Sequence, residues 1–269
     1  MNAPSDYLEV SLRLGIFLGM FLLLMVLEIL LPRRKLRYSK LRRWTSNIAL
    51  GIFNTVIVRF LAPILGVAAA TFASQHQWGL LNQVSLPSWI EMLLFLLLFD
   101  FVIYIQHRVF HAVPLLWQLH RMHHTDRDYD VTTGNRFHPL SIVISSLFKT
   151  ALILLTGPSI AAVLVAEVLL NACAMFNHSN LRIPVALDRF MRLFVVTPDM
   201  HRVHHSVDED EHNCNFGFNF PWWDRLLGTY RAQPAHGHEE MEIGIEGFRD
   251  ERSEKFTQML VQPLSKGSE

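Results

Sequence analysis

Long apolar runs constrain this chain more than any other feature of its sequence. The first, residues 8–31, is long enough to cross the hydrocarbon core of a bilayer as a helix. Two further runs cover 46–73 and 89–106, and a fourth, 139–178, is too long for a single span. Because a Gly-Pro pair at 157–158 divides the fourth run, we expect two helices joined as a hairpin there. The runs therefore predict an all-α, integral-membrane helical bundle of about four to five membrane helices.

The charge distribution predicts how these helices are oriented. Seven Lys and Arg residues lie between Arg33 and Arg43, directly after the first run, whereas the loop 74–88 carries no formal charge. Basic loops tend to stay in the cytoplasm. A cleaved signal peptide is the alternative reading of 8–31, but it would carry its positive charge before the apolar run. We therefore expect an uncleaved anchor, a cytoplasmic basic loop and an external loop at 74–88.

Composition agrees with a membrane protein and excludes some functions. Hydrophobic residues make up 51% of the chain, and its mean hydropathy of +0.23 is high for a soluble enzyme. Its net charge of zero gives no general attraction to nucleic acid. Cys173 and Cys214 form no CxxC motif, which argues against both a disulfide framework and a thiolate metal site.

Histidine clusters are the second distinctive feature. Ten of the 14 histidines lie between His107 and His205. Residues i, i+3 and i+4 of a helix share one face, so each cluster can aim two or three imidazoles at one point. Imidazole ligates iron, zinc, copper and nickel, and eight ligands exceed the roughly four to six of one ion, so the spacing predicts two metals. The clusters are His107-x-x-x-His111, His120-x-x-His123-His124 and His201-x-x-His204-His205.

The second cluster illustrates how two metals can be served. Adjacent positions on a helix point about 100° apart. His123 and His124 can therefore serve different metals, while His120 joins one of them. The alternative is a basic surface helix, but Asp126 and Asp128 offset the arginines nearby.

Below the first cluster, Asp100 and Tyr104 continue its helical stripe, because Asp100, Tyr104, His107 and His111 are spaced 4, 3 and 4 apart. A carboxylate inside a membrane span is costly and usually functional. Asp100 can accept a hydrogen bond from a ligand histidine or from Tyr104 and so fix the ligand's orientation. We expect this supporting role for both residues; the alternative is a polar clamp between helices.

Two isolated histidines are further candidates. His178 ends a second stripe that begins at Glu167, at the same predicted membrane depth as the clusters, and we expect it to be a ligand. His138 precedes Pro139 at the membrane boundary and is a candidate ligand or supporting donor. The alternative for His178 is a structural histidine with no metal. We expect ordinary loop positions for the remaining histidines, His76, His212, His236 and His238.

This ordered set of motifs resembles the fatty acid hydroxylase / sterol desaturase superfamily of integral-membrane enzymes. The resemblance covers roughly 90–230 and extends to Asn177-His178 and to the stretch 223–230. It implies a non-haem dimetal centre, with iron in the working enzyme and zinc as a substitute, that activates O2 to hydroxylate or desaturate a lipid C–H bond. Some hydroxylases of the superfamily carry a histidine where this chain has Ala174, so His138 is a candidate replacement. The superfamily's ligand positions correspond to His107, His111, His120, His123, His124, His201, His204 and His205, with His178 as an addition.

The electron donor is expected to be external. The sequence has no GxGxxG for a flavin or nicotinamide, and His138-Pro139 lacks the glycines of a cytochrome b5 haem motif. An electron-transfer protein, or the reduced pterin used by ether-lipid-cleaving members of the superfamily, would supply the electrons. The lipid substrate stays open among fatty acyl, sterol, sphingoid and ether lipids.

Three other functions fit the histidines less well. A zinc-dependent membrane hydrolase would need a glutamate base, as in HExxH, and none of the clusters has one. A haem cytochrome would need histidine pairs within facing spans. A metal transporter would place its ligands at mid-membrane.

We expect three regions along the chain. Residues 1–88 would form the N-terminal membrane helices and basic loop. Residues 89–232 would form the catalytic domain, whose cytosolic helical cap holds the dimetal site. The tail 233–269 has Gly, Pro and mixed charge and is expected to be loosely held. Within the cap, we expect a solvated acidic loop at 208–211, and a lid or a membrane-interface segment at 216–230.

Overall fold

The computed structural model describes residues 4–61 and 65–267, and it is all-helical, with no strand among them. Five of its helices are long and apolar enough to cross a membrane. The predicted all-α, integral-membrane bundle of four to five membrane helices is therefore confirmed. The five helices are α1 (Pro4–Leu30), α2 (Lys40–Leu61), α4 (Ser88–Ala112), α6 (Pro139–Thr156) and α7 (Ile160–Asn177).

The predicted hairpin between α6 and α7 is also confirmed. Gly157 ends α6 in the left-handed conformation, with φ of 62°, and the Ser159 side chain caps the start of α7. A short helix, α3 (Val67–Gln75), and the 3-10 turn η2 (Leu80–Gln83) lie beside this hairpin. The predicted run 46–73 is thus divided between α2 and α3, and its residues 62–64 lie outside the described part of the chain.

A tight backbone contact closes this end of the bundle. A Cβ atom on Gly79 would lie 2.3 Å from the backbone nitrogen of Gly157, so only glycine fits there. The Asn82 side-chain amide donates to the Gly157 carbonyl over 3.0 Å. The apolar core above it is formed by α3, α4, α6 and α7 and includes Phe99 and Ile153.

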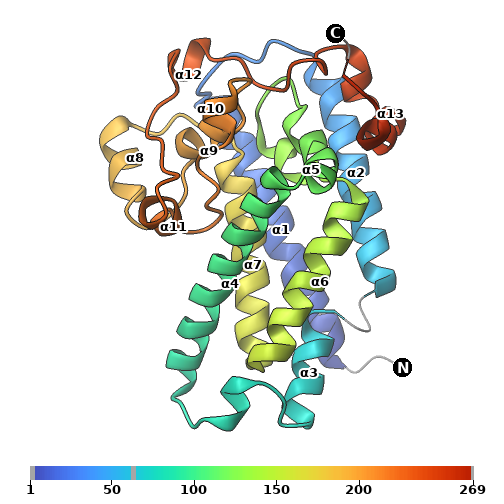
Figure 1. Cartoon of the computed structure of the whole chain (residues 1–269), viewed down its shortest axis with the longest axis vertical. Helices are drawn as coiled ribbons and strands as arrows, with labels where there is room; N and C mark the ends of the chain where they lie inside the picture. The colour runs from blue at the N-terminus through green and yellow to red at the C-terminus, as the bar shows by residue number, and fades with distance from the viewer. Residues whose placement is uncertain (1–3, 62–64, 268–269) are drawn as a thin grey trace.

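The remaining helices gather at the opposite end of the bundle and form a cap (Figure 1). Helix α4 enters the cap at its C-terminal end, which carries the first histidine cluster, and α7 enters it at His178. The candidate ligands therefore meet at one end of the bundle. Its elements are α5 (Pro114–His124), η3 (Val131–Asn135), α8 (Val185–Met191), α9 (Pro198–His204), α10 (Glu209–His212), α11 (Trp222–Leu226), α12 (Gly237–Glu240), η4 (Glu251–Glu254), α13 (Phe256–Val261) and η5 (Gln262–Leu264).

A buried ion network ties α2 to the cap just after the second histidine cluster. Arg43 is wholly buried; its Nε lies 2.6 Å from Asp126 Oδ1, and its Nη1 lies 2.8 Å from Asp130 Oδ2. Burial alone would raise the pKa of the Asp126 carboxyl, but the Arg43 guanidinium beside it holds that pKa well below its usual range. The network therefore anchors the chain directly after His124.

The expectation of a loosely held C-terminal tail is wrong. Arg136 is buried and donates to the Ser253 carbonyl, and the Thr125 hydroxyl donates to Gln262 Oε1 over 3.1 Å. Met259 is fully buried in a cluster with α2 and α5. The polar composition suggested a solvated tail, but its backbone carbonyls instead accept hydrogen bonds from buried arginines of the cap.

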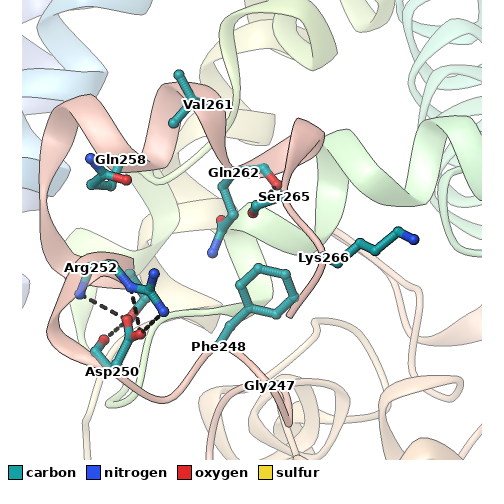
Figure 2. Close-up of a pocket in the computed structure, with 10 residues that line it drawn as sticks. Gly247, Phe248, Asp250, Arg252, Gln258, Val261, Gln262, Ser265 and Lys266 are labelled. Atoms are coloured by element: carbon teal, nitrogen blue, oxygen red, sulfur yellow. Dashed lines mark hydrogen bonds and ion pairs between the residues drawn. The ribbon is translucent and has the colours of Figure 1, made fainter. Parts of the chain in front are cut away.

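Figure 2 shows a surface cleft in this segment, between the turn at 247–248 and the last helices. Asp250 and Arg252 form an exposed ion pair of 2.5 Å on its rim. None of the residues that line the cleft is a predicted metal ligand. The cleft therefore lies outside the predicted site.

Removing the buried cation should destabilise the protein. In Arg43→Met, the Asp126 carboxylate would remain buried without its partner, which costs on the order of 3–5 kcal/mol. We expect a clearly lower midpoint of thermal unfolding in detergent. The control is Arg42→Met, which removes an exposed pair with Glu251 and should change the midpoint little. Equal midpoints for the two variants would contradict the anchoring role.

Candidate metal centre

The candidate ligands form two buried sets of histidines. Within each set, every residue offers a ring nitrogen, and these nitrogens all lie within 4.8 Å of one another. The structure brings all eight clustered histidines and His178 into these two sets. The first set is His107, His111, His120, His124 and His204, and the second is His123, His178, His201 and His205.

Short connections between helices bring the sets together. Val113 ends α4, and Pro114 begins α5 directly, so the first two clusters meet across one sharp turn. His123 and His124 fall in different sets, in agreement with the 100° between adjacent helical positions. The third cluster lies on α9, whose first turn is capped by the Thr197 side chain. His178 is the C-cap residue of α7.

Backbone carbonyls fix the tautomers of three of the histidines. The Nδ1 atoms of His107, His204 and His178 lie 2.9, 2.7 and 2.6 Å from the carbonyls of Phe216, Cys214 and Ala174. A carbonyl only accepts hydrogen bonds, so each Nδ1 carries the proton. In a neutral imidazole the Nε2 atom then presents its lone pair, as a metal ligand must.

The first set fits a metal ion. The Nε2 atoms of His107 and His204 lie 3.0 Å apart, and both present lone pairs. Such a contact is repulsive unless a cation lies between the two atoms. Two imidazole nitrogens bound at about 2.1 Å to one ion, at right angles, would themselves be about 3 Å apart.

Unpartnered ring nitrogens support the same conclusion for both sets. Neither ring nitrogen of His111, His201 or His205 has a hydrogen-bond partner among the described residues, although all are buried. Buried polar atoms without a partner are rare in proteins, and a metal would satisfy these. Neither set contains a carboxylate or a thiolate, so the donors are all imidazoles.

Five histidines of the two sets that lie in the cap are neutral at pH 7, as metal binding requires. Burial lowers the pKa of His123, His124, His201, His204 and His205 well below the usual value, and neighbouring imidazoles lower it further. Neutral rings leave the lone pairs available without competition from protons.

The two sets of histidines are in direct contact. The rings of His124, from the first set, and His205, from the second, stack with centroids 4.5 Å apart. His107 and His201 lie 6.2 Å apart. Metals bound in both sets would therefore be neighbours in one buried centre.

Asp100 and Tyr104 act on a cap loop rather than on a ligand histidine. Asp100 accepts hydrogen bonds from the Asn219 backbone and from Trp223 Nε1, at 3.0 and 2.8 Å. The Tyr104 hydroxyl lies 2.8 Å from Thr229 Oγ1. Asp100 lies about 10 Å from His107 along α4, and its hydrogen bonds go to this loop rather than to a ligand histidine or Tyr104, the two partners expected for it. The loop that Asp100 binds also carries the Phe216 carbonyl, which contacts His107 Nδ1.

Asp224, for which we predicted no role, binds the backbone of the same loop. Its carboxylate accepts from the backbone of Phe216 and Gly217, both at 2.8 Å, and from Thr229 Oγ1. A Cβ atom on Gly217 would lie 2.6 Å from the carboxylate, so glycine permits the approach. Burial raises the pKa of Asp224 to about 6, although these donors favour its charged form. Asp224 is the single acidic residue of the aromatic stretch 216–230, and this isolation was the feature of the sequence that could have indicated its role.

Two other histidines differ from expectation. His138 lies in neither set: its Nδ1 accepts from the Leu140 backbone at the start of α6, and its Nε2 lies 3.1 Å from the Leu260 carbonyl. With both nitrogens used, it is a helix cap and not one of the ligands we propose. His212, expected to be an ordinary loop residue, is buried and stacks on Trp117 beside the first set.

The expected acidic loop at 208–211 is only partly solvated. Asp208 to Asp210 are exposed, but Glu211 is buried and lies 3.0 Å from Arg231. The ion pair with Arg231 explains why Glu211, unlike the three acids before it, can be buried. It also joins α10, which carries His212, to the segment that follows α11.

A bundle of candidate membrane helices that ends in two all-histidine sets defines a class of histidine-rich membrane proteins. The family model described as "Fatty acid hydroxylase" matches residues 92–229, about half of the chain. The chain belongs to the fatty acid hydroxylase family, and the resemblance inferred from its motifs is confirmed.

Individual relatives are lipid-modifying enzymes. Ornithine lipid hydroxylase OlsE of Rhizobium tropici is 33% identical over 186 residues, covering 67% of this chain and 52% of that protein. Alkylglycerol monooxygenase of Homo sapiens is 31% identical over 134 residues, covering 50% of this chain and 29% of that protein. Cholesterol 25-hydroxylase of Rattus norvegicus is 23% identical, covering 87% and 79%. The chain thus spans about half, or less, of the first two relatives, and no solved structure matches it.

Elemental analysis tests the two sets directly. The purified protein should hold two metal ions per chain, one for each set. His204→Ala should remove the ion of the first set, and His205→Ala that of the second, leaving one ion in each variant. His138→Asn, which retains a helix-capping side chain, should keep both. A single ion in the unmodified protein, or loss of metal in His138→Asn, would contradict the assignment.

A second prediction concerns the supporting loop. Asp224→Asn cannot accept from both backbone amides and the Thr229 hydroxyl, so the Phe216 carbonyl should hold His107 less firmly. We expect about 10- to 100-fold weaker metal binding in a chelator competition. The control is Asp208→Asn, on the exposed turn, which should bind metal normally. Unchanged affinity in Asp224→Asn would show that the loop does not support the ligands.

Proposed function

We propose that this chain is a non-haem di-iron oxidoreductase that uses O2 to hydroxylate or desaturate a C–H bond of a membrane lipid. The observation that carries the proposal is the pair of adjoining, all-imidazole sets at the end of a membrane bundle. Two iron ions bound there would pass electrons from an external donor to O2 and supply the oxidising power for an unactivated C–H bond.

The chain's own residues prepare the site for this chemistry. Nine neutral imidazoles bring no negative charge, so bound metals would keep their full positive charge and remain strong oxidants. The carbonyls of Phe216, Cys214 and Ala174 hold three ligands in their binding tautomer. A zinc-dependent hydrolase, the alternative, would require a carboxylate base, and neither set contains one.

Aromatic side chains shield the sets from water. Phe137 stacks on His123 at 4.3 Å, and Phe216 packs against His111 at 5.1 Å. Excluding water protects an oxidising centre from side reactions and leaves an apolar approach for a lipid. The names of the relatives, hydroxylases and a monooxygenase of lipids, favour hydroxylation as the reaction.

The cytoplasmic leaflet is the proposed location of the site. The basic segment 33–43 joins α1 to α2 at the same end of the bundle as the histidine sets (Figure 1), and basic segments favour the cytoplasm. The cytoplasm would supply an electron-transfer protein or a reduced pterin as the external donor. Residues 89–232 would form the catalytic domain, braced by the C-terminal segment.

Lipid analysis with isotopically labelled O2 tests the proposal. Membranes that contain the protein should form an oxidised lipid that depends on O2, and hydroxylation would place the label in the product. His123→Ala and His204→Ala should each abolish the product while the protein stays in the membrane, because each removes a ligand from one set. His76→Ala, an exposed position far from the sets, is the control. Activity retained in either ligand variant, or a hydrolytic product, would refute the proposal.

A further inference from the structure

The cap exposes a concentrated apolar surface on α8 and α11, which we call the α8–α11 face. Its large side chains are between 45% and 73% exposed, which is unusual for a surface that faces water. Two of them, Phe190 and Phe194, pack against each other with ring centroids 5.7 Å apart, and both remain more than half exposed. The face consists of Val185, Leu187, Phe190, Phe194, Leu226 and Leu227.

The face lies alongside a membrane helix rather than beyond its end. Trp223 of α11 packs on Phe101 of α4 at 4.8 Å and donates to Asp100. Phe101 lies about 16 Å along α4 from Ala112, its cap end, at 1.5 Å per residue. Figure 1 shows α11 beside the upper part of α4, with α8 next to it.

Hydrogen bonds hold α8 at the same place. Trp222 Nε1 donates to the Leu193 carbonyl over 2.6 Å, and Arg225 donates to the Arg192 carbonyl over 3.2 Å. The two helices therefore form one unit, attached to α4 within its candidate membrane span Ser88–Ala112. A surface at this depth is continuous with the lipid-facing side of the bundle.

The charges on this unit have one sign at the surface. Its two acids, Asp188 and Asp224, are buried. The exposed charged side chains of segments 181–195 and 221–227 are all arginines: Arg182, Arg189 and Arg225. Apolar side chains beside arginines, with tryptophans nearby, are typical of surfaces that lie in the membrane interface and attract anionic lipids.

We propose that the α8–α11 face inserts into the lipid leaflet at the histidine end of the bundle, with its arginines on anionic headgroups. The inference concerns the position of the cap in the bilayer and does not require the proposed activity. His107 lies about 9 Å beyond Phe101 along α4, so insertion of the face places the histidine sets near headgroup level. A lipid of that leaflet then reaches the sets without leaving the membrane.

Nitroxide labels read by electron paramagnetic resonance test the insertion. Single labels would be placed at Phe190→Cys and Leu226→Cys in the full chain, with both native cysteines replaced by alanine, in lipid nanodiscs. Collisions with O2, which concentrates in lipid, should exceed those with a water-soluble nickel chelate. A label at Leu98→Cys on the exposed side of α4 gives the lipid reference, and Leu264→Cys in η5, which is 89% exposed, gives the aqueous one.

Two results would overturn the insertion. The labels at Phe190 and Leu226 could collide with the nickel chelate as readily as the label at Leu264. Alternatively, the two labels could be protected from the nickel chelate only when two copies of the protein share a nanodisc or when a protein partner is added. In the first case the face lies in water, and in the second it is a protein interface.

The arginines are tested by changing the lipid. Nanodiscs that contain phosphatidylglycerol should place the Phe190 label deeper than nanodiscs of phosphatidylcholine alone. The double variant Arg182→Gln, Arg189→Gln should lose this difference. Equal depth in the two lipids would overturn the preference for anionic headgroups.

Discussion

The cap depends on imidazole lone pairs that are held toward one another in a buried space. His107 and His204 face each other at 3.0 Å with their protons committed to backbone carbonyls. In a low-dielectric interior such an arrangement is unfavourable for the bare protein, and a cation converts it into a favourable one. Metal binding should therefore contribute to the stability of the cap as well as to its chemistry.

Three braces hold the ligands against this repulsion. The Arg43–Asp126 pair anchors the chain after the second cluster. Asp100, on the membrane helix α4, and Asp224, on α11, both accept hydrogen bonds from the backbone of the loop that carries the Phe216 carbonyl. The C-terminal segment packs on α5 through Met259, which is buried against Met122. Apart from those of Asp224, these contacts join elements that are distant in the sequence.

Local sequence patterns predicted the bundle and the division of His123 and His124 between two sets, because both rest on short-range periodicity. Apolar runs set the membrane helices, and the spacing of His120, His123 and His124 determines which ring faces which set. The long-range contacts had no such pattern. Nothing local showed that Asp100 would bind the loop, that the tail would pack on buried arginines, or that His138 would cap α6.

The central claim is that nine histidines hold two neighbouring metals at the membrane surface. Anomalous X-ray diffraction at the iron edge, from crystals of iron-loaded protein, measures this most directly. Two peaks are expected, one within each histidine set. A single peak between the sets, or metal only at exposed histidines, would contradict the claim.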